Sequence, residues 1–202
     1  MIEKVVVDLG GVAARFRPER RLGRLASISH LTEELIKERL FNSGLEDRAE
    51  RGEYPPAEVI ANVLAALDGR VSAADLIAAW AMAFEPDTQV AGCLGLIQVP
   101  TVLLTNNGPL LDACVDGPLR ELRVTFDDII CSWHLKARKP EAIAFERAAE
   151  RLGCSPNRLL LLDDSEENVN AALQCGWDAS LVTSIDDLVD ALSRRPGLRE
   201  PT

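Results

Sequence analysis

Residues 5–12 read VVVDLGGV, and residues 159–165 read LLLLDDS. Each stretch is a run of β-branched residues or leucine that ends in aspartate, a pattern typical of a buried parallel strand. Three further apolar runs have the same character. The expected strands cover residues 5–8, 101–105, 129–132, 159–163 and 180–183.

Helical patterns separate most of these strands. One helix is expected to open at Pro140, a residue that suits the first helical position, and to end at Gly153. Another carries Val169 and Ala172 on one face and ends at Gly176. Because strands alternate with helices, we predict an α/β fold with a Rossmann-like, doubly wound parallel sheet.

The stretch between the first and second strands is too long for one crossover connection and contains no convincing strand. Helices are expected at residues 21–29 and 32–42, after Pro55-Pro56, and after the capping box Ser72-x-x-Asp75. We therefore expect residues 15–88 to form an all-helical cap on a core made of residues 1–14 and 89–202. The apolar stripes of these helices would form the cap's own core, and only loops such as residues 45–54 would reach a substrate.

Composition excludes several classes of protein. The 202 residues include 22 Lys and Arg against 32 Asp and Glu, a formal net charge of -10, which argues against nucleic-acid binding. The five cysteines form no C-x-x-C pair, so neither a disulfide framework nor a structural zinc site is indicated. The first residues, MIEKVVVDLGG, lack the apolar segment of a signal peptide, and no later run approaches the length of a membrane span. We expect a cytosolic protein with no membrane partner.

Polar residues follow the ends of the predicted strands, where ligands bind in an open parallel sheet. Asp8 ends the first strand and Asp163-Asp164 ends the fourth. Carboxylates that converge at one edge repel one another unless a cation compensates them. Their oxygen ligands, with no His or Cys nearby in the sequence, indicate Mg²⁺ rather than Zn²⁺.

Each motif also has a simpler interpretation. Glycines after Asp8 often mark only a turn, and Asp163-Asp164-Ser165 suits the start of a helix. Lys139, before Pro140, could be an ordinary surface charge. Thr105 and Lys139 together favour a phosphate site, because phosphate needs hydroxyl donors and a compensating cation.

Four segments in order, VVVDLGGV, LLTNN, ARKPEAIAFERAAERLG and LLLLDDSEENVNAAL, resemble the four motifs of the haloacid dehalogenase-like hydrolase superfamily. The expected insertion resembles the cap of a subfamily that includes phosphoglycolate phosphatases, 2-haloacid dehalogenases, sugar-phosphate phosphatases and the N-terminal phosphatase domain of epoxide hydrolases. The DLGGV form is most similar to the sugar-1-phosphate phosphatase branch.

The resemblance implies catalytic and substrate-binding roles. Asp8 would be the nucleophile that forms an aspartyl-phosphate, which water then hydrolyses. Thr105 and the backbone amide of Asn106 would hold the phosphoryl oxygens. Lys139 would neutralise the charge shared by Asp8 and the phosphoryl group, so it is both a catalytic and a substrate-binding candidate.

The resemblance also implies a Mg²⁺ site. Asp8, the backbone carbonyl of Gly10 and Asp164 would bind the ion, with Asp163 contributing directly or through water. Asn168 falls where many relatives have a further acidic residue, which gives it a place around the metal.

The sequence departs from the family pattern at Gly10. Most phosphatases of the superfamily have Asp there, which serves as general acid and then general base. Its absence leaves the proton transfers unassigned, and neither His30 nor His134 can be assigned to them from the sequence. Unless a metal-bound water or a group from the cap donates the proton, turnover should depend steeply on the leaving group.

The leading hypothesis is a Mg²⁺-dependent phosphatase acting on a small phosphorylated metabolite such as a sugar phosphate. A second hypothesis within the hydrolases is a 2-haloacid dehalogenase. Such an enzyme needs no metal, so Asp163 and Asp164 would have no cation to compensate them. A catalytically degenerate binding or regulatory protein is the alternative from another class, since Gly10 removes a catalytic group.

Overall fold

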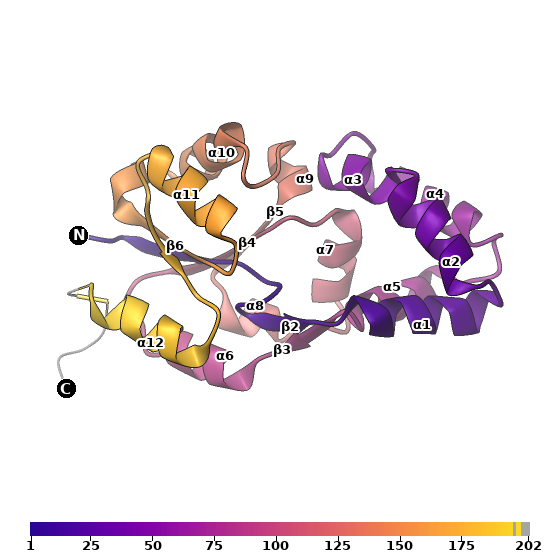
Figure 1. Cartoon of the computed structure of the whole chain (residues 1–202), viewed down its shortest axis with the longest axis horizontal. Helices are drawn as coiled ribbons and strands as arrows, with labels where there is room; N and C mark the ends of the chain where they lie inside the picture. Colours follow the sequence, from indigo (N-terminus) through magenta and orange to yellow (C-terminus); the bar gives the residue numbers. More distant parts are fainter. Residues whose placement is uncertain (196, 199–202) are drawn as a thin grey trace.

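The computed structural model describes residues 1–195, 197 and 198. Its centre is a parallel sheet of five strands in the order β5-β4-β1-β6-β7 (Figure 1). The strands are β1 (Lys4–Val7), β4 (Thr101–Thr105), β5 (Asp128–Cys131), β6 (Leu159–Asp163) and β7 (Asp178–Leu181). This sheet confirms the α/β fold class.

Strand β1 lies in the middle of the sheet, between β4 and β6. From β4 the sheet continues to β5, and from β6 it continues in the opposite direction to β7. Loops that leave neighbouring strands in opposite directions open a crevice at the carboxyl ends of those strands. The ends of β4, β1 and β6 therefore define where a ligand site is expected.

Helices cover both faces of the sheet (Figure 1). Val6 packs with Phe145 of α10, whereas Val5 and Val7 belong to the core on the other face, together with Leu188 of α12. The alternation follows from the period of two residues along a strand. The helices of this part are α6 (Thr88–Leu94), α7 (Pro109–Val115), α8 (Leu122–Thr125), α9 (Ser132–Leu135), α10 (Ala142–Leu152), α11 (Glu166–Gln174), α12 (Ile185–Ser193) and a 3-10 turn at Pro156–Arg158.

The inserted segment forms a group of helices at one end of the molecule (Figure 1). They are α1 (Pro18–Ser29), α2 (Glu33–Ile36), which continues as a π-helix over Lys37–Asn42, α3 (Leu45–Glu50), α4 (Pro56–Ala66) and α5 (Ala73–Ala81). Two short antiparallel strands, β2 (Ala14–Phe16) and β3 (Phe84–Pro86), join these helices to the sheet. These two strands were not predicted from the sequence, because three-residue strands carry too little pattern to be recognised.

Two expectations about the cap need correction. Its apolar stripes do not form a separate core: α4 and α5 pack against α7, and one apolar cluster joins Val63 and Leu76 to Leu111 of α7. Residues 45–54 are not simply a loop, since they begin with helix α3.

All five cysteines lie in the described part of the chain and are free thiols there. Within the described residues, no helix has both the length and the apolar character needed to cross a bilayer.

Candidate active site

Lys139 is the centre of the site. Its Nζ donates hydrogen bonds to Asp8 Oδ1 at 2.7 Å, to Asp163 Oδ2 at 2.6 Å and to the carbonyl oxygen of Leu104 at 2.9 Å. Lys139 is only 4% exposed, and Asp163 is fully buried. A single buried ammonium therefore joins the ends of β1, β4 and β6.

This cluster contains more carboxylates than ammonium groups. Burial raises the pKa of Asp8 to about 6, although Lys139 opposes the shift, and the charges of Asp163 and Asp164 raise it further. Burial, followed by the charge of Asp163, also raises the pKa of Asp164. Burial disfavours the charged amine of Lys139, but Asp8 and Asp163 outweigh it and raise the pKa of Lys139. The three carboxylates thus share one cation, and a second cation would relieve their repulsion.

Asp163 has both oxygens engaged within the protein. While Oδ2 binds Lys139, Oδ1 accepts from the backbone amide of Ser165 at 3.0 Å and from Asn168 Nδ2 at 2.8 Å. Asn168 therefore orients a buried carboxylate. This arrangement favours an indirect part for Asp163 at any metal.

Asp164 lies against the loop that follows Asp8. A Cβ added at Gly11 would be 2.0 Å from Asp164 Oδ2, and Gly11 has a φ of +93°. Only glycine permits both this backbone conformation and this close approach. Asp8, the Gly10 carbonyl and Asp164 offer hard oxygen donors with excess negative charge, which fits Mg²⁺.

Asn106 fixes the position of the Lys139 backbone. Its Nδ2 donates to the carbonyl oxygen of Lys139 at 2.8 Å, and its Oδ1 accepts from the amide of Lys139 at 2.9 Å. Thr105 is buried beside it, and Thr105 Oγ1 accepts from Asn107 Nδ2 at 2.8 Å. Asn107 was not predicted as a site residue. Its backbone N–H donates to Ser132 Oγ at 3.1 Å.

A cavity of about 250 Å³ opens above these residues. The residues that line it from the sheet side are Asp8, Gly10, Thr105, Asn106, Asn107, Lys139 and Asn168. The inserted helices and the strands β2 and β3 contribute Phe16, Arg21, Glu46, Glu50 and Phe84. The expected catalytic residues thus meet at one cavity. Neither His30 nor His134 is among the lining residues.

Sequence reasoning did not find the cavity residues of α1 and α3. Arg21 is 5% exposed, lies over the ring of Trp80 with 4.2 Å to its centroid, and donates to Glu46 Oε1 at 3.1 Å. Burial raises the pKa of Glu46, against the opposing charge of Arg21. Arg21 is one of several arginines in α1, and Glu46 is one of several acidic residues in LEDRAE. Neither can be recognised as a site residue before the packing of the helices is known.

Glu50, the last residue of α3, is also buried at the cavity. Ion pairs hold this helix against the segment that carries Lys139: Arg138 contacts Asp47, and Arg51 Nη1 lies 2.6 Å from Glu141 Oε1. The end of α3 is therefore tied to residues that come before and after Lys139 in the chain.

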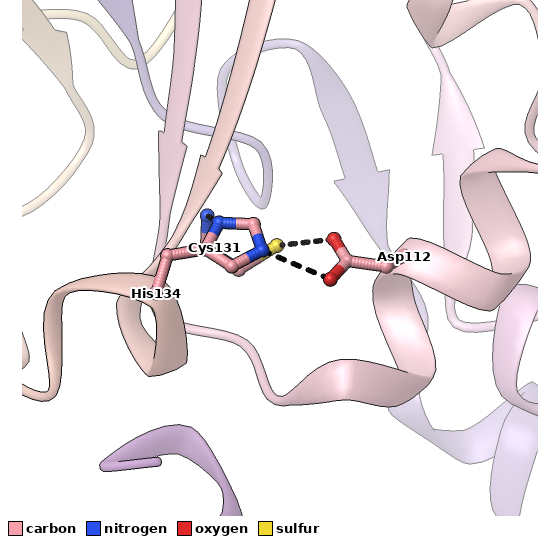
Figure 2. A group of neighbouring side chains, drawn as sticks. All are labelled: Asp112, Cys131 and His134. Atoms are coloured by element: carbon pink, nitrogen blue, oxygen red, sulfur yellow. Dashed lines mark hydrogen bonds and ion pairs between the residues drawn. The ribbon is translucent and has the colours of Figure 1, made fainter. Parts of the chain in front are cut away.

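A second group of metal-ligating residue types lies away from the cavity lining, between α7 and α9 (Figure 2). Asp112 Oδ2 is 3.0 Å from His134 Nε2, and Asp112 Oδ1 accepts from the Cys131 thiol at 3.4 Å. His134 Nδ1 accepts from the amide of Cys131 at 3.1 Å, so Nε2 carries the proton and donates to Asp112. Burial raises the pKa of the Cys131 thiol well above its usual value. In this structure the three side chains form a hydrogen-bond network that joins α7 to α9.

The family model for haloacid dehalogenase-like hydrolases matches residues 11–176, a span that begins three residues after Asp8. No curated protein matches the chain.

Solved structures share the fold. A HAD family enzyme from Bacteroides thetaiotaomicron, in complex with magnesium and inorganic phosphate, is 25% identical, with a TM-score of 0.73 over 90% of this chain and 94% of that one. A predicted HAD-like family hydrolase from Porphyromonas gingivalis is 22% identical, with a TM-score of 0.77 over 96% and 97%. L-2-haloacid dehalogenase from Xanthobacter autotrophicus, with chloropropionic acid covalently bound, is 20% identical, with a TM-score of 0.60 over 98% and 84%.

Proposed function

We propose that this chain, which belongs to the haloacid dehalogenase-like hydrolase family, is a Mg²⁺-dependent phosphatase of small phosphorylated metabolites. The observation that carries the proposal is that Asp8 and Asp163 share the single ammonium of Lys139, while the charge of Asp164 also acts on Asp8. Excess carboxylate charge at a buried cavity calls for a divalent cation. A phosphate dianion can then bind between that cation and Lys139.

Asp8 acts as the nucleophile. One of its oxygens forms a bond to phosphorus while the bond from phosphorus to the leaving oxygen breaks. Lys139 holds Asp8 in place and offsets the negative charge of the reacting groups. Thr105 and the amide of Asn106, both at the cavity, hold the phosphoryl oxygens.

Asp8, the Gly10 carbonyl and Asp164 would hold Mg²⁺, and Asp163 would act on the site through Lys139 and Asn168. When bound, the ion supplies positive charge to the carboxylates and phosphoryl oxygens. The magnesium and phosphate in the Bacteroides thetaiotaomicron enzyme support this assignment.

The cap side of the cavity supports a polar substrate. We assign residues 15–88 to a cap and residues 1–14 and 89–202 to the catalytic core, of which residues 196 and 199–202 lie outside the described part of the chain. Arg21, Glu46 and Glu50 of that cap present charged or hydrogen-bonding groups to the leaving group, which suits a hydroxylated compound such as a sugar phosphate. The unpaired cysteines suit a reducing compartment, so we expect the enzyme in the cytosol.

The test is a panel of phosphorylated metabolites with saturating Mg²⁺ or with EDTA, together with 2-chloropropionate. We expect release of inorganic phosphate that requires Mg²⁺ and is abolished in Asp8→Asn. Chloride release without added metal would instead identify a dehalogenase, and no hydrolysis of any compound would support a binding or regulatory role.

A further inference from the structure

The proposed reaction moves a proton twice. A leaving alkoxide must be protonated in the first step, and the attacking water must lose a proton in the second. Gly10 has no side chain to do either. The group that does must be ionisable, and it must reach the cavity that holds Asp8 and Lys139.

Five ionisable side chains line that cavity: Asp8, Arg21, Glu46, Glu50 and Lys139. Asp8 is the nucleophile, and the ammonium of Lys139 already donates to three acceptors. Arg21 stays protonated at all relevant pH values, and it holds Glu46 in an ion pair of 3.1 Å. Glu50 also lies near an arginine, with Oε2 2.9 Å from Arg138 Nε, but unlike Glu46 it accepts no hydrogen bond from that arginine.

The position of Glu50 is well fixed. Its carbonyl oxygen accepts from Ser132 Oγ at 2.8 Å, which ties the end of α3 to α9. The side chain is buried, yet Oε2 receives no hydrogen bond: Arg138 Nε lies 2.9 Å away but does not point its N–H at the oxygen. Glu50 thus has a fixed backbone and a buried carboxyl group with unused hydrogen-bonding capacity.

The surroundings of Glu50 favour its neutral form. Burial raises the pKa of Glu50 to about 8; Arg138 and Arg21 lower it, while Glu46 and Asp47 raise it. A carboxylic acid that is protonated near neutral pH can donate its proton and take one back within the same cycle.

We propose that Glu50 of the cap is the general acid and general base of this enzyme and replaces the side chain that Gly10 lacks. The inference rests on the proposed phosphatase function. In the first step Asp8 bonds to phosphorus, the leaving oxygen departs with the bonding electrons, and it takes the proton of the Glu50 carboxyl group. In the second step the Glu50 carboxylate takes a proton from a water molecule. The oxygen of that water bonds to phosphorus, and the bond from Asp8 to phosphorus breaks. Alcohol and phosphate are released, and both carboxyl groups return to their starting states.

The experiment compares wild type, Glu50→Gln and the matched control Glu53→Gln on phosphate esters of rising leaving-group pKa, with saturating Mg²⁺. Glu53 lies in the same segment and is exposed. A positioned acid contributes about 10²–10⁴-fold, so we expect Glu50→Gln to lose that factor on alkyl phosphates. On an aryl phosphate, which departs without help, Glu50→Gln should show a burst of phenol followed by slow turnover, because the aspartyl-phosphate accumulates. Glu53→Gln should match wild type.

A rescue separates catalysis from a structural role. A Cβ added at Gly10 would lie 3.6 Å from Phe16 Cβ, an ordinary contact, so the backbone at position 10 leaves room for the first side-chain atom of an aspartate. We expect Gly10→Asp in the Glu50→Gln background to restore alkyl phosphate hydrolysis. Equal alkyl and aryl losses in Glu50→Gln, with no burst and no rescue, would overturn the proposal.

Wild type alone gives an independent measurement. Its single-turnover rate on alkyl phosphates should fall as the pH rises through about 8, and its rate on aryl phosphates should not. A fall on neither substrate would overturn the proposal even if Glu50→Gln failed to fold. If wild type hydrolyses no ester, the phosphatase function itself is wrong, whereas active wild type with a fully active Glu50→Gln rejects only the role of Glu50.

Discussion

Asp8→Asn should make the protein more stable while it removes all turnover. Folding raises the pKa of Asp8 from 3.8 to about 6, mainly through burial, so the folded state holds the ionised carboxylate at a cost. At about 1.4 kcal/mol per pKa unit, the shift corresponds to roughly 3 kcal/mol above pH 6. Asparagine carries no charge at any pH and still offers Lys139 an oxygen acceptor.

The sign of the pH dependence follows from the raised pKa. The contribution of Asp8 to stability is fully present below its unfolded pKa and is lost as the pH rises through about 6. Wild type and Asp8→Asn should therefore be equally stable near pH 3 and diverge above it. The variant should be more stable by about 2–3 kcal/mol at neutral pH.

Urea unfolding in EDTA measures this difference. With a slope of roughly 1–3 kcal/mol per molar urea, the midpoint of Asp8→Asn should lie on the order of 1 M above that of wild type. Adding Mg²⁺ should raise the wild-type midpoint and narrow the gap, because ligand binding to the native state stabilises it. Asp116→Asn, which removes an exposed pair with Arg123, is the matched control and should change stability by less than about 1 kcal/mol.

A midpoint of Asp8→Asn at or below that of wild type, at neutral pH in EDTA, would contradict a destabilising buried carboxylate at Asp8. It would mean that the 2.7 Å bond from Lys139 outweighs the burial of the Asp8 carboxylate.

Three further changes test other parts of the site. Lys139→Met leaves two buried carboxylates without their cation, so it should destabilise the protein by about 3–5 kcal/mol and slow single turnover at least about 10²-fold; a near-normal rate would remove Lys139 from the chemistry. Gly11→Ala should cost at least about 1–2 kcal/mol and weaken Mg²⁺ binding measured by calorimetry, since its Cβ would displace Asp164; unchanged affinity would argue against Asp164 as a ligand. Asp112→Asn should lower stability by about 1–3 kcal/mol at neutral pH in urea unfolding. Despite its burial, hydrogen bonds that include one from His134 lower the pKa of Asp112, so the difference should shrink as the pH falls below about 4, and a pH-independent difference would contradict this account.

The sheet was predictable because its signals are local. Strands β4 and β6 begin and end where the apolar runs do, and β1 and β5 differ from their predicted bounds by one residue. Strand β7 lies two residues earlier than expected, since it is a half-buried edge strand and its sequence is less apolar. Asp8, Thr105 and Asp163 could be placed together from strand ends alone, because parallel strands bring their carboxyl ends to one edge.

Position in the sequence did not predict how the carboxylates are used. Asp163 and Asp164 are adjacent, yet one is fully buried with both oxygens bonded and the other lies against Gly11. Successive residues at a strand end point in different directions, and the partners that distinguish them come from other elements.

The cap side of the cavity was decided only by tertiary structure. Helix α3 has six residues, too few to form stably alone, and its docking depends on contacts with residues about ninety positions later, such as the pair of Arg51 and Glu141. Burial by that docking is also what gives Glu50 its raised pKa, because the free energy of a charge depends on what surrounds it. The sheet, the nucleophile candidate and the lack of an acidic side chain at position 10 could all be predicted from local sequence. The packing of the inserted helices on the sheet decides which residue can replace the side chain that Gly10 lacks. Long-range contacts set this packing, and no local sequence pattern predicts it.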